Sequence, residues 1–302
     1  MSTPLDANSE QRALRRGGRV LCGMPKPQRS VPRWQRALIT GASAGIGAAF
    51  ARELAAEGTA LVLVARRTAP LETIANELRE VGVDVEILVA DLSDRAQVQR
   101  VADRVSATTD PVDLLINNAG ISVWGRFDQQ PIDRHEELLA VLVTAPMILT
   151  HAAAAAMTSR GAGTILNVSS LAGNGPVPEL ASYSGAKSFI NTFSQAVSRE
   201  LHRSGVVVTT VVPGQTRTQI NDAAGHPIDT TGRDWMEPQK VVRQALAAAA
   251  AGRRHVIPGR RNRLEAMFTP RYPNGYGGLI LRVGWAPMVV YRKLKERRSA
   301  LK

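Results

Sequence analysis

The amino-acid sequence predicts an α/β protein with a doubly wound parallel sheet of about seven strands in a single domain, residues 35–259. Short apolar runs alternate with longer segments that carry helix formers at helical spacing, as in strand–helix–strand units. The first apolar run leads into a glycine-rich turn, and an alanine-rich amphipathic segment follows. A chain of 302 residues with 44% hydrophobic content can bury one sizeable core.

The apolar runs that are too short for helices are expected to form the strands. These runs are Ala37–Thr40, Ala60–Ala65, Val85–Val89, Leu114–Asn117, Gly163–Val168, Val206–Val212 and His255–Ile257. The segments between them are expected to form helices at Ile46–Glu57, Pro70–Val81, Arg95–Ser106, Arg134–Ser159, Ser182–His202 and Pro238–Ala251.

The net charge of +12 is concentrated at the two ends of the chain. Residues 1–36 carry 8 basic and 2 acidic groups and residues 252–302 carry 13 and 2, whereas the residues between them carry 17 and 22. Because the body is mildly acidic, we expect no nucleic-acid partner. Residues 1–34 lack hydrophobic periodicity and are predicted to form a mobile basic extension.

The C-terminal extension, residues 260–302, combines an apolar stretch with a basic cluster. Leu279–Tyr291 is apolar apart from Arg282 and is followed by several Lys and Arg residues. It is too short to span a bilayer, which takes about 20 residues in a helix. It can anchor the protein peripherally to anionic lipid, or pack on the substrate cleft or another subunit, and we favour packing. The single cysteine, Cys22, suits a reducing compartment, so we expect a cytoplasmic location, with peripheral membrane contact as the alternative.

Tyr183 and Lys187 are four residues apart in a segment that reads as the start of a helix. This spacing places both side chains on one helical face, where the ammonium can lower the pKa of the phenol. The phenol can then exchange a proton with a carbonyl or alcohol oxygen.

The glycine-rich turn, residues 40–47, reads Thr-Gly-Ala-Ser-Ala-Gly-Ile-Gly between a predicted strand and a predicted helix. The backbone N–H groups of such a turn and the helix dipole together form a cradle for a pyrophosphate. This turn and the Tyr183–Lys187 pair independently indicate a dinucleotide cofactor.

These motifs resemble the short-chain dehydrogenase/reductase family, from about Arg36 to about Gly259. Its landmarks appear in the family's order: the glycine turn, Asn117-Asn118-Ala119-Gly120, Ser169-Ser170, Tyr183-x-x-x-Lys187 and Pro213-Gly214. The resemblance implies a Rossmann-type fold and hydride transfer between a nicotinamide and a carbonyl or secondary alcohol, without a metal ion. It also implies a homodimer or homotetramer paired through the two long helices, near Arg134–Ser159 and Ser182–His202.

The choice of nicotinamide cofactor is expected to depend on the residues after the second strand, beside the adenosine ribose. Here the chain reads Ala65-Arg66-Arg67, with no carboxylate. Two guanidinium groups fit a 2′-phosphate, and Ser43 in the turn can add a further donor, so NADP(H) is expected. The alternative is that one of the two arginines is a solvated surface residue.

Other cofactor contacts follow from the resemblance, residue by residue. Asp91 resembles the family's adenine-contacting acid, with Leu92 beside it, and Lys187 resembles the lysine that also binds the nicotinamide ribose. The remaining expected contacts lie in the glycine turn, the end of the fourth strand, the helix with Lys187 and the loop after the sixth strand: Gly41, Gly45, Ile46, Gly47, Asn118, Ala119, Gly120, Tyr183, Pro213, Gly214, Thr216 and Thr218.

The catalytic assignments also follow the resemblance. Ser170 lies 13 residues before Tyr183, which matches the family's spacing better than Ser169 does. We therefore expect Ser170 to polarise the carbonyl, Tyr183 to transfer the proton and Lys187 to lower the tyrosine pKa, whereas Ser169 packs at the strand end.

One position departs from the family. Leu142, in Val141-Leu142-Val143-Thr144-Ala145-Pro146, stands where the family has a catalytic asparagine. A leucine cannot hold the water of the family's proton relay. Three alternatives follow: a neighbouring residue takes the place of the asparagine, turnover is slow, or the protein has lost the reaction and serves as an NADPH-binding sensor or scaffold. We favour the first two over the third.

The substrate pocket is expected to form from Ser122–Gln130, Leu171–Leu180 and Ile220–Met236. These segments contribute mostly apolar side chains: Trp124, Phe127, Leu171, Val177, Leu180, Trp235 and Met236. Such a lining favours a lipophilic ketone or aldehyde, or the corresponding alcohol, over a sugar phosphate or an acid.

Overall fold

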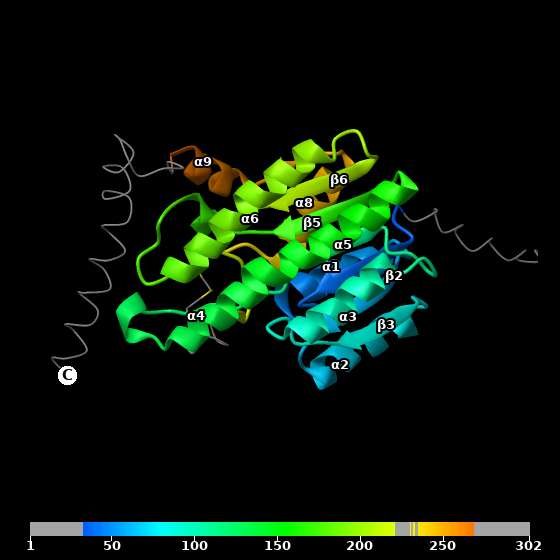
Figure 1. Ribbon diagram of the computed structural model, residues 1–302, viewed down its shortest axis with the longest axis horizontal. Helices are drawn as coiled ribbons and strands as arrows, with labels where there is room; N and C mark the ends of the chain where they lie inside the picture. The colour runs from blue at the N-terminus through cyan, green and yellow to red at the C-terminus, as the bar shows by residue number, and fades with distance from the viewer. Residues whose placement is uncertain (1–32, 221–229, 231, 233–234, 269–302) are drawn as a thin grey trace, which may run out of the picture. The chain divides into compact units, whose positions relative to one another are not determined.

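The computed structural model describes residues 33–220, 230, 232 and 235–268 (Figure 1). Its centre is a seven-stranded sheet in the order β3-β2-β1-β4-β5-β6-β7, in which all neighbouring strands are parallel. The strands are β1 (Arg36–Thr40), β2 (Ala60–Ala65), β3 (Val85–Val89), β4 (Leu114–Asn117), β5 (Gly163–Val168), β6 (Val206–Val211) and β7 (His255–Val256). The order reverses between β1 and β4, so the ligand crevice is expected at the carboxyl ends of these two strands.

Helices cover both faces of the sheet, which confirms the predicted doubly wound α/β fold. One core contains α1, α2 and α8, and the other contains α3, α4, α5 and α6, the last three of which appear in green in Figure 1. The helices are α1 (Gly45–Ala56), α2 (Thr68–Glu80), α3 (Arg95–Ser106), η1 (Phe127–Gln129), α4 (Ile132–Leu139), η2 (Ala140–Thr144), α5 (Ala145–Arg160), η3 (Leu171–Asn174), α6 (Ala181–Glu200), α8 (Pro238–Ala250) and α9 (Arg260–Phe268).

The two cores follow from the alternation of side chains along each strand. In β1, Ala37 and Ile39 belong to the core on the α1 side, whereas Leu38 belongs to the core on the α5 side. Leu38 lies in register with Val62 of β2 and Leu115 of β4, which are in the same core. Strands buried on both faces read as continuous apolar runs, and this is why the sequence located them.

The long helix expected over Arg134–Ser159 is interrupted by a turn of π-helix, η2. The backbone N–H of Ala145 bonds to the carbonyl of Ala140, five residues back. Pro146 has no N–H, and in a regular helix its ring would clash with the carbonyl four residues earlier, that of Leu142. The wider π turn accommodates the proline and places Leu142 within the irregular segment.

The folded body includes residues on both sides of the expected limits, 35 and 259. Trp34 is buried and its indole Nε1 donates a hydrogen bond to Thr164 Oγ1 at 3.1 Å. Asn262 of α9 is also buried. The terminal extensions at residues 1–32 and 269–302, including the apolar and basic tail, lie outside the described residues.

Candidate active site

The glycine turn joins β1 to the start of α1 at the carboxyl edge of the sheet. Gly41 has φ +66°, which favours glycine, and a Cβ on Gly47 would lie 2.1 Å from the carbonyl oxygen of Gly41. The first helical residue is Gly45, and no side chain of the described residues caps this helix end. The first-turn N–H groups, near Ser43 and Ile46, can therefore bind the oxygens of a pyrophosphate.

The end of β4 is tied to this turn by hydrogen bonds. Thr40 Oγ1 accepts from the backbone N–H groups of Asn118 at 2.9 Å and Ala119 at 3.1 Å. Asn118 Nδ2 donates to the carbonyl oxygens of Thr40 at 2.9 Å and Gly41 at 3.3 Å. The side chain of Asn118 thus supports the turn, and Gly120 follows it along the same edge.

The adenosine end of the expected cofactor site contains Arg66, Arg67, Asp91 and Leu92. Asp91 Oδ1 accepts hydrogen bonds from the backbone N–H of Ser93 at 2.9 Å and from its hydroxyl at 2.7 Å, and Leu92 is buried. Arg67 is exposed and precedes α2; within the described part of the chain it forms no ion pair.

Arg66, by contrast, is already paired. Its Nη1 lies 3.0 Å from Glu137 Oε1 in α4 and 3.7 Å from Asp91 Oδ2. The two arginines that the sequence assigned jointly to a 2′-phosphate are therefore in different electrostatic settings.

The structure brings together the three side chains that were assigned to catalysis. Ser170 follows β5, and Tyr183 and Lys187 lie in the first turns of α6. The hydroxyl of Ser170 is close enough to that of Tyr183 to act on the pKa of the phenol, and its Oγ accepts a hydrogen bond from the backbone N–H of Ala172 at 3.1 Å. Lys187 Nζ lies 5.7 Å from the centre of the Tyr183 ring and donates to the carbonyl oxygen of Val168 at 2.9 Å. Ser169 Oγ instead donates to the carbonyl oxygen of Lys187 at 2.9 Å, so Ser169 ties β5 to α6.

Burial changes the acidity of both titratable groups. It raises the pKa of Tyr183, an effect that the Ser170 hydroxyl partly offsets, so the expectation that Lys187 lowers this pKa is wrong: desolvation of the phenol outweighs any such effect. It lowers the pKa of Lys187 from 10.5 to about 8. A lysine with this pKa can exist in either protonation state near neutral pH, as a proton-transfer site requires.

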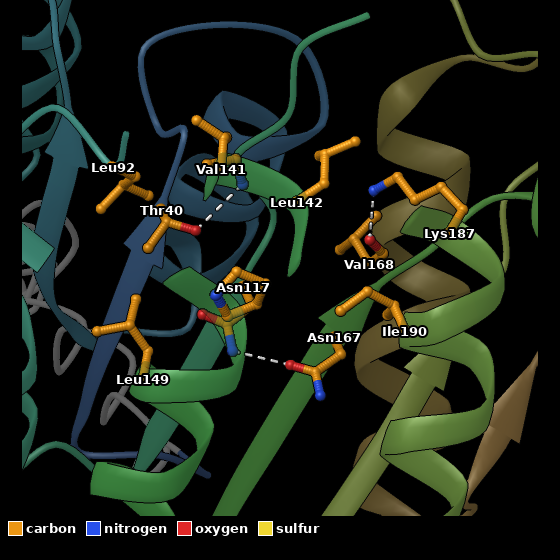
Figure 2. A pocket seen from close by; sticks show the side chains of 12 residues that line it. Thr40, Leu92, Asn117, Val141, Leu142, Leu149, Asn167, Val168, Lys187 and Ile190 are labelled. Carbon is orange, nitrogen blue, oxygen red and sulfur yellow. Dashed lines mark hydrogen bonds between the residues drawn. The ribbon is translucent and has the colours of Figure 1, made fainter. Parts of the chain in front are cut away.

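Leu142 lies beside this group, at the position of the family's asparagine. It is 1% exposed, and Figure 2 shows its side chain between Val141 and Lys187. A Cβ added to Gly120 would lie 3.4 Å from Leu142 Cδ2, so the leucine also lies close to the segment that follows β4.

A small pocket with both polar and apolar lining lies below Leu142 and Lys187 (Figure 2). Its volume is about 10 Å³, close to the minimum for one water molecule. Asn117 Nδ2 donates to Asn167 Oδ1 at 2.8 Å, and Asn167 Nδ2 donates to Ser194 Oγ at 2.9 Å. Asn117 Oδ1 is buried without a hydrogen-bond partner among the described residues. The lining comes from β1, β4, β5, the loops after β3 and β4, and nearby helices: Thr40, Leu92, Asn117, Ala119, Val141, Leu142, Pro146, Leu149, Asn167, Val168, Lys187 and Ile190.

The loop after β6 closes the opposite side of the crevice. Thr216 Oγ1 donates to the carbonyl oxygen of Gly214 at 3.0 Å, and Gly214, after Pro213, packs so closely on Asn262 that a Cβ would lie 2.5 Å from its Oδ1. A Cβ on Gly45 would lie 3.0 Å from Thr218 Cγ2. The loop is therefore positioned between the glycine turn and α9.

The described side chains of the expected substrate pocket differ in how exposed they are to solvent. Val177 and Leu180 are buried, whereas Phe127 is 56% exposed, with its ring centroid 4.8 Å from that of His135. Met236 packs against the core on the α1 side. Most of the segment between Ile220 and Met236 lies outside the described residues.

Three side chains with structural roles at the site were missed by the sequence analysis. Asn167 could have been found, because an amide within an apolar buried strand signals a specific hydrogen bond. Glu137 and Asn262 carry no local signal, since their partners lie far away in the sequence.

The glycine turn at a helix start and the Ser170–Tyr183–Lys187 group fit a nicotinamide dinucleotide and define the site of an oxidoreductase. A family model described as short chain dehydrogenase matches residues 35–228. A short chain dehydrogenase of Pseudocercospora fijiensis is 31% identical over 201 residues, which cover 64% of this chain and 65% of that protein. The chain belongs to the short-chain dehydrogenase family.

Two solved structures are similar over most of the folded body. One is a short-chain dehydrogenase from Sphingobium yanoikuyae in complex with NADPH, with a TM-score of 0.71 and 38% identity, covering 77% of this chain and 91% of that chain. The other is the bulky-bulky ketone specific alcohol dehydrogenase from Comamonas testosteroni, with a TM-score of 0.68, 33% identity and the same coverage.

Proposed function

We propose that the protein is an NADP(H)-dependent oxidoreductase that interconverts a lipophilic ketone or aldehyde and the corresponding alcohol. The observation that carries this proposal is the convergence of Ser170, Tyr183 and Lys187, where Lys187 lines the same pocket as Thr40 at the start of the glycine turn. When bound, NADP(H) supplies or accepts the hydride at the carbonyl carbon.

The chain's own side chains handle the charge on the carbonyl oxygen. During reduction, negative charge develops on that oxygen, and the Ser170 hydroxyl donates a hydrogen bond to it. Tyr183 gives its proton to the same oxygen, and in the oxidation direction it takes the proton from the alcohol. Lys187, whose pKa burial lowers to about 8 and whose Nζ lies 5.7 Å from the centre of the Tyr183 ring, gives a proton back to the tyrosine after reduction or takes one from it before oxidation, by way of a water molecule in the pocket that it lines.

The preference for NADPH rests on Arg66, Arg67 and the absence of an acidic residue directly after β2. It is supported by the NADPH complex of the Sphingobium protein, which is 38% identical to this chain. Equal affinity for NADPH and NADH would contradict this part of the proposal.

The proposed substrate class rests on the apolar side chains around the site. Val177 and Leu180 are buried beside the catalytic serine loop, and Trp124 lies on the loop after β4. The similar Comamonas enzyme is described as specific for bulky-bulky ketones, which supports a large apolar carbonyl compound. Turnover of highly polar carbonyl compounds alone would contradict this assignment.

A second candidate is an NADPH-binding sensor or scaffold that has lost turnover, and Leu142 is the observation that favours it. The two functions respond differently to Tyr183→Phe, which removes the hydroxyl that transfers the proton. We expect this variant to lose at least about a hundredfold in turnover, since general acid–base catalysis contributes about 10²–10⁴-fold, while NADPH affinity changes by less than about twofold.

The test begins with a fluorescence titration of the purified protein with NADPH and with NADH. A screen of ketones and aldehydes then compares the wild type with Tyr183→Phe. Tight NADPH binding without turnover of any carbonyl compound by the wild type would favour the sensor. Failure of the folded protein to bind either dinucleotide would reject both candidates.

The proposed assembly is a homodimer or homotetramer in the cytoplasm. The helix pair α4–α5 exposes Ile132, Leu139 and Met147, apolar side chains that a second copy could cover. Peripheral membrane contact through residues 279–302 stays an alternative that sedimentation with anionic vesicles can test, by comparing the full chain with a form that lacks these residues.

A further inference from the structure

Three charged side chains from distant parts of the chain meet at the adenosine edge of the sheet. Arg66 follows β2, Asp91 follows β3, and Glu137 lies in α4. Nη1 of Arg66 lies 3.0 Å from Glu137 Oε1 and 3.7 Å from Asp91 Oδ2. Glu137 is the more enclosed acid, with its side chain 25% exposed, against 34% for Asp91.

Both carboxylates are also held by other groups. Asp91 Oδ1 is bound by Ser93, so its second oxygen is fixed in the direction of Arg66. Oε2 of Glu137 lies 3.9 Å from Nη1 of Arg134, an exposed side chain one turn away in the same helix. Oε1 of Glu137 thus remains directed at Arg66 in the 3.0 Å hydrogen bond.

This pairing reduces what Arg66 can offer to a phosphate. A guanidinium binds a phosphate best through two parallel N–H donors and its full positive charge. Here one nitrogen is occupied, and two carboxylates within 4 Å offset the charge. Arg67 forms no such pair within the described part of the chain, so its whole donor set is available.

We propose that Glu137 is a specificity-determining residue that weakens the preference for NADPH over NADH by holding Arg66 in this pair. The inference rests on the proposed function, because it concerns how that cofactor is selected. Arg67 then provides most of the contact with the 2′-phosphate, and Glu137 acts through Arg66 and not by touching the cofactor.

The Glu137→Gln variant tests the proposal, because it keeps the shape of the side chain and removes its charge. We expect its Kd for NADPH to fall about fivefold. The variant loses an ion pair that competes with the phosphate for Arg66, and a partly exposed ion pair contributes an interaction energy of about this size. The Kd for NADH, which has a hydroxyl in place of the 2′-phosphate, should change by less than about twofold. Glu136→Gln is the matched control, since it removes the same charge from an exposed neighbouring position of α4 and should change neither Kd.

The same substitution in an Arg66→Ala background separates action through Arg66 from a general charge effect. In that background the gain in NADPH affinity should fall below about twofold. The inference about Glu137 would be overturned, and the proposed function would still stand, in either of two cases. In the first, Glu137→Gln leaves the ratio of the Kd values for NADPH and NADH unchanged; in the second, it raises NADPH affinity equally with and without Arg66. If the folded wild-type protein bound neither dinucleotide, the proposed function would fail as well.

Discussion

Lys187 lies in the interior of the protein, and its burial makes the stability of the fold depend on pH in a predictable way. Its pKa is lowered from 10.5 to about 8 because the surroundings disfavour the charged ammonium. Between these two values the unfolded chain binds more protons than the folded chain, so the stability should rise with pH. The destabilisation is present in full below about pH 8 and disappears as the pH approaches 10.5.

The size of the effect follows from these two pKa values. Integrating the linkage relation from about pH 7 to about pH 9.5 gives a gain of about 2 kcal/mol in the free energy of unfolding from this lysine. Lys187→Met removes the titrating group. The difference in stability between this variant and the wild type should therefore shift by about 2 kcal/mol between the two pH values. The lost hydrogen bond to Val168 contributes about equally at both pH values and cancels.

Urea denaturation followed by circular dichroism measures these free energies without cofactor present. Lys240→Met, at an exposed position of α8, serves as the control and should run parallel to the wild type at both pH values. If the curves of Lys187→Met and the wild type were also parallel, the ammonium would not be destabilised by burial, and the reasoning about the proton-transfer site would be wrong.

Two further substitutions test the glycine turn and the departure from the family. Gly47→Ala should weaken NADPH binding about tenfold or more in a titration, because its Cβ would lie 2.1 Å from the carbonyl oxygen of Gly41 and force the turn open. Gly185→Ala is the contrasting control: apart from the backbone of its own helix and its chain neighbours, no heavy atom of the described residues lies within 4 Å of the new Cβ, and the helix should gain about 0.5–1 kcal/mol in thermal or urea unfolding. NADPH affinity equal to wild type in Gly47→Ala would contradict the cradle. Leu142→Asn, at a residue 1% exposed beside Lys187, should leave turnover unchanged or raise it while lowering the unfolding free energy by about 1–3 kcal/mol. A large loss of turnover in folded Leu142→Asn would mean that the leucine has a positive role.

The prediction of the strands succeeded because a buried parallel strand is a local pattern. Ala60–Ala65, Val85–Val89, Leu114–Asn117 and Gly163–Val168 have the expected bounds in the structure. The π turn before Pro146 was missed, although the proline itself marked the place where a regular helix cannot continue.

The candidate site was predictable where its residues are close in the sequence. Tyr183 and Lys187 lie one helical turn apart, and the glycine turn occupies eight consecutive residues, so spacing alone indicated their chemistry. The convergence of Ser170 with Tyr183 depends instead on how β5 and α6 pack, and the pairing of Asn117 with Asn167 depends on the neighbouring places of β4 and β5 in the sheet.

The sequence by itself determined the fold class, the order of the elements and the residue types that a nicotinamide site needs, because these are encoded in runs and spacings of a few residues. Only the tertiary structure decided that burial lowers the pKa of Lys187 and that Gly214 packs on Asn262. It also decided that Arg66 is paired with Glu137, 71 residues away, while Arg67 is not. The physical reason is that charge pairing and desolvation depend on distances in space, which folding sets by bringing remote segments to the same edge of the sheet.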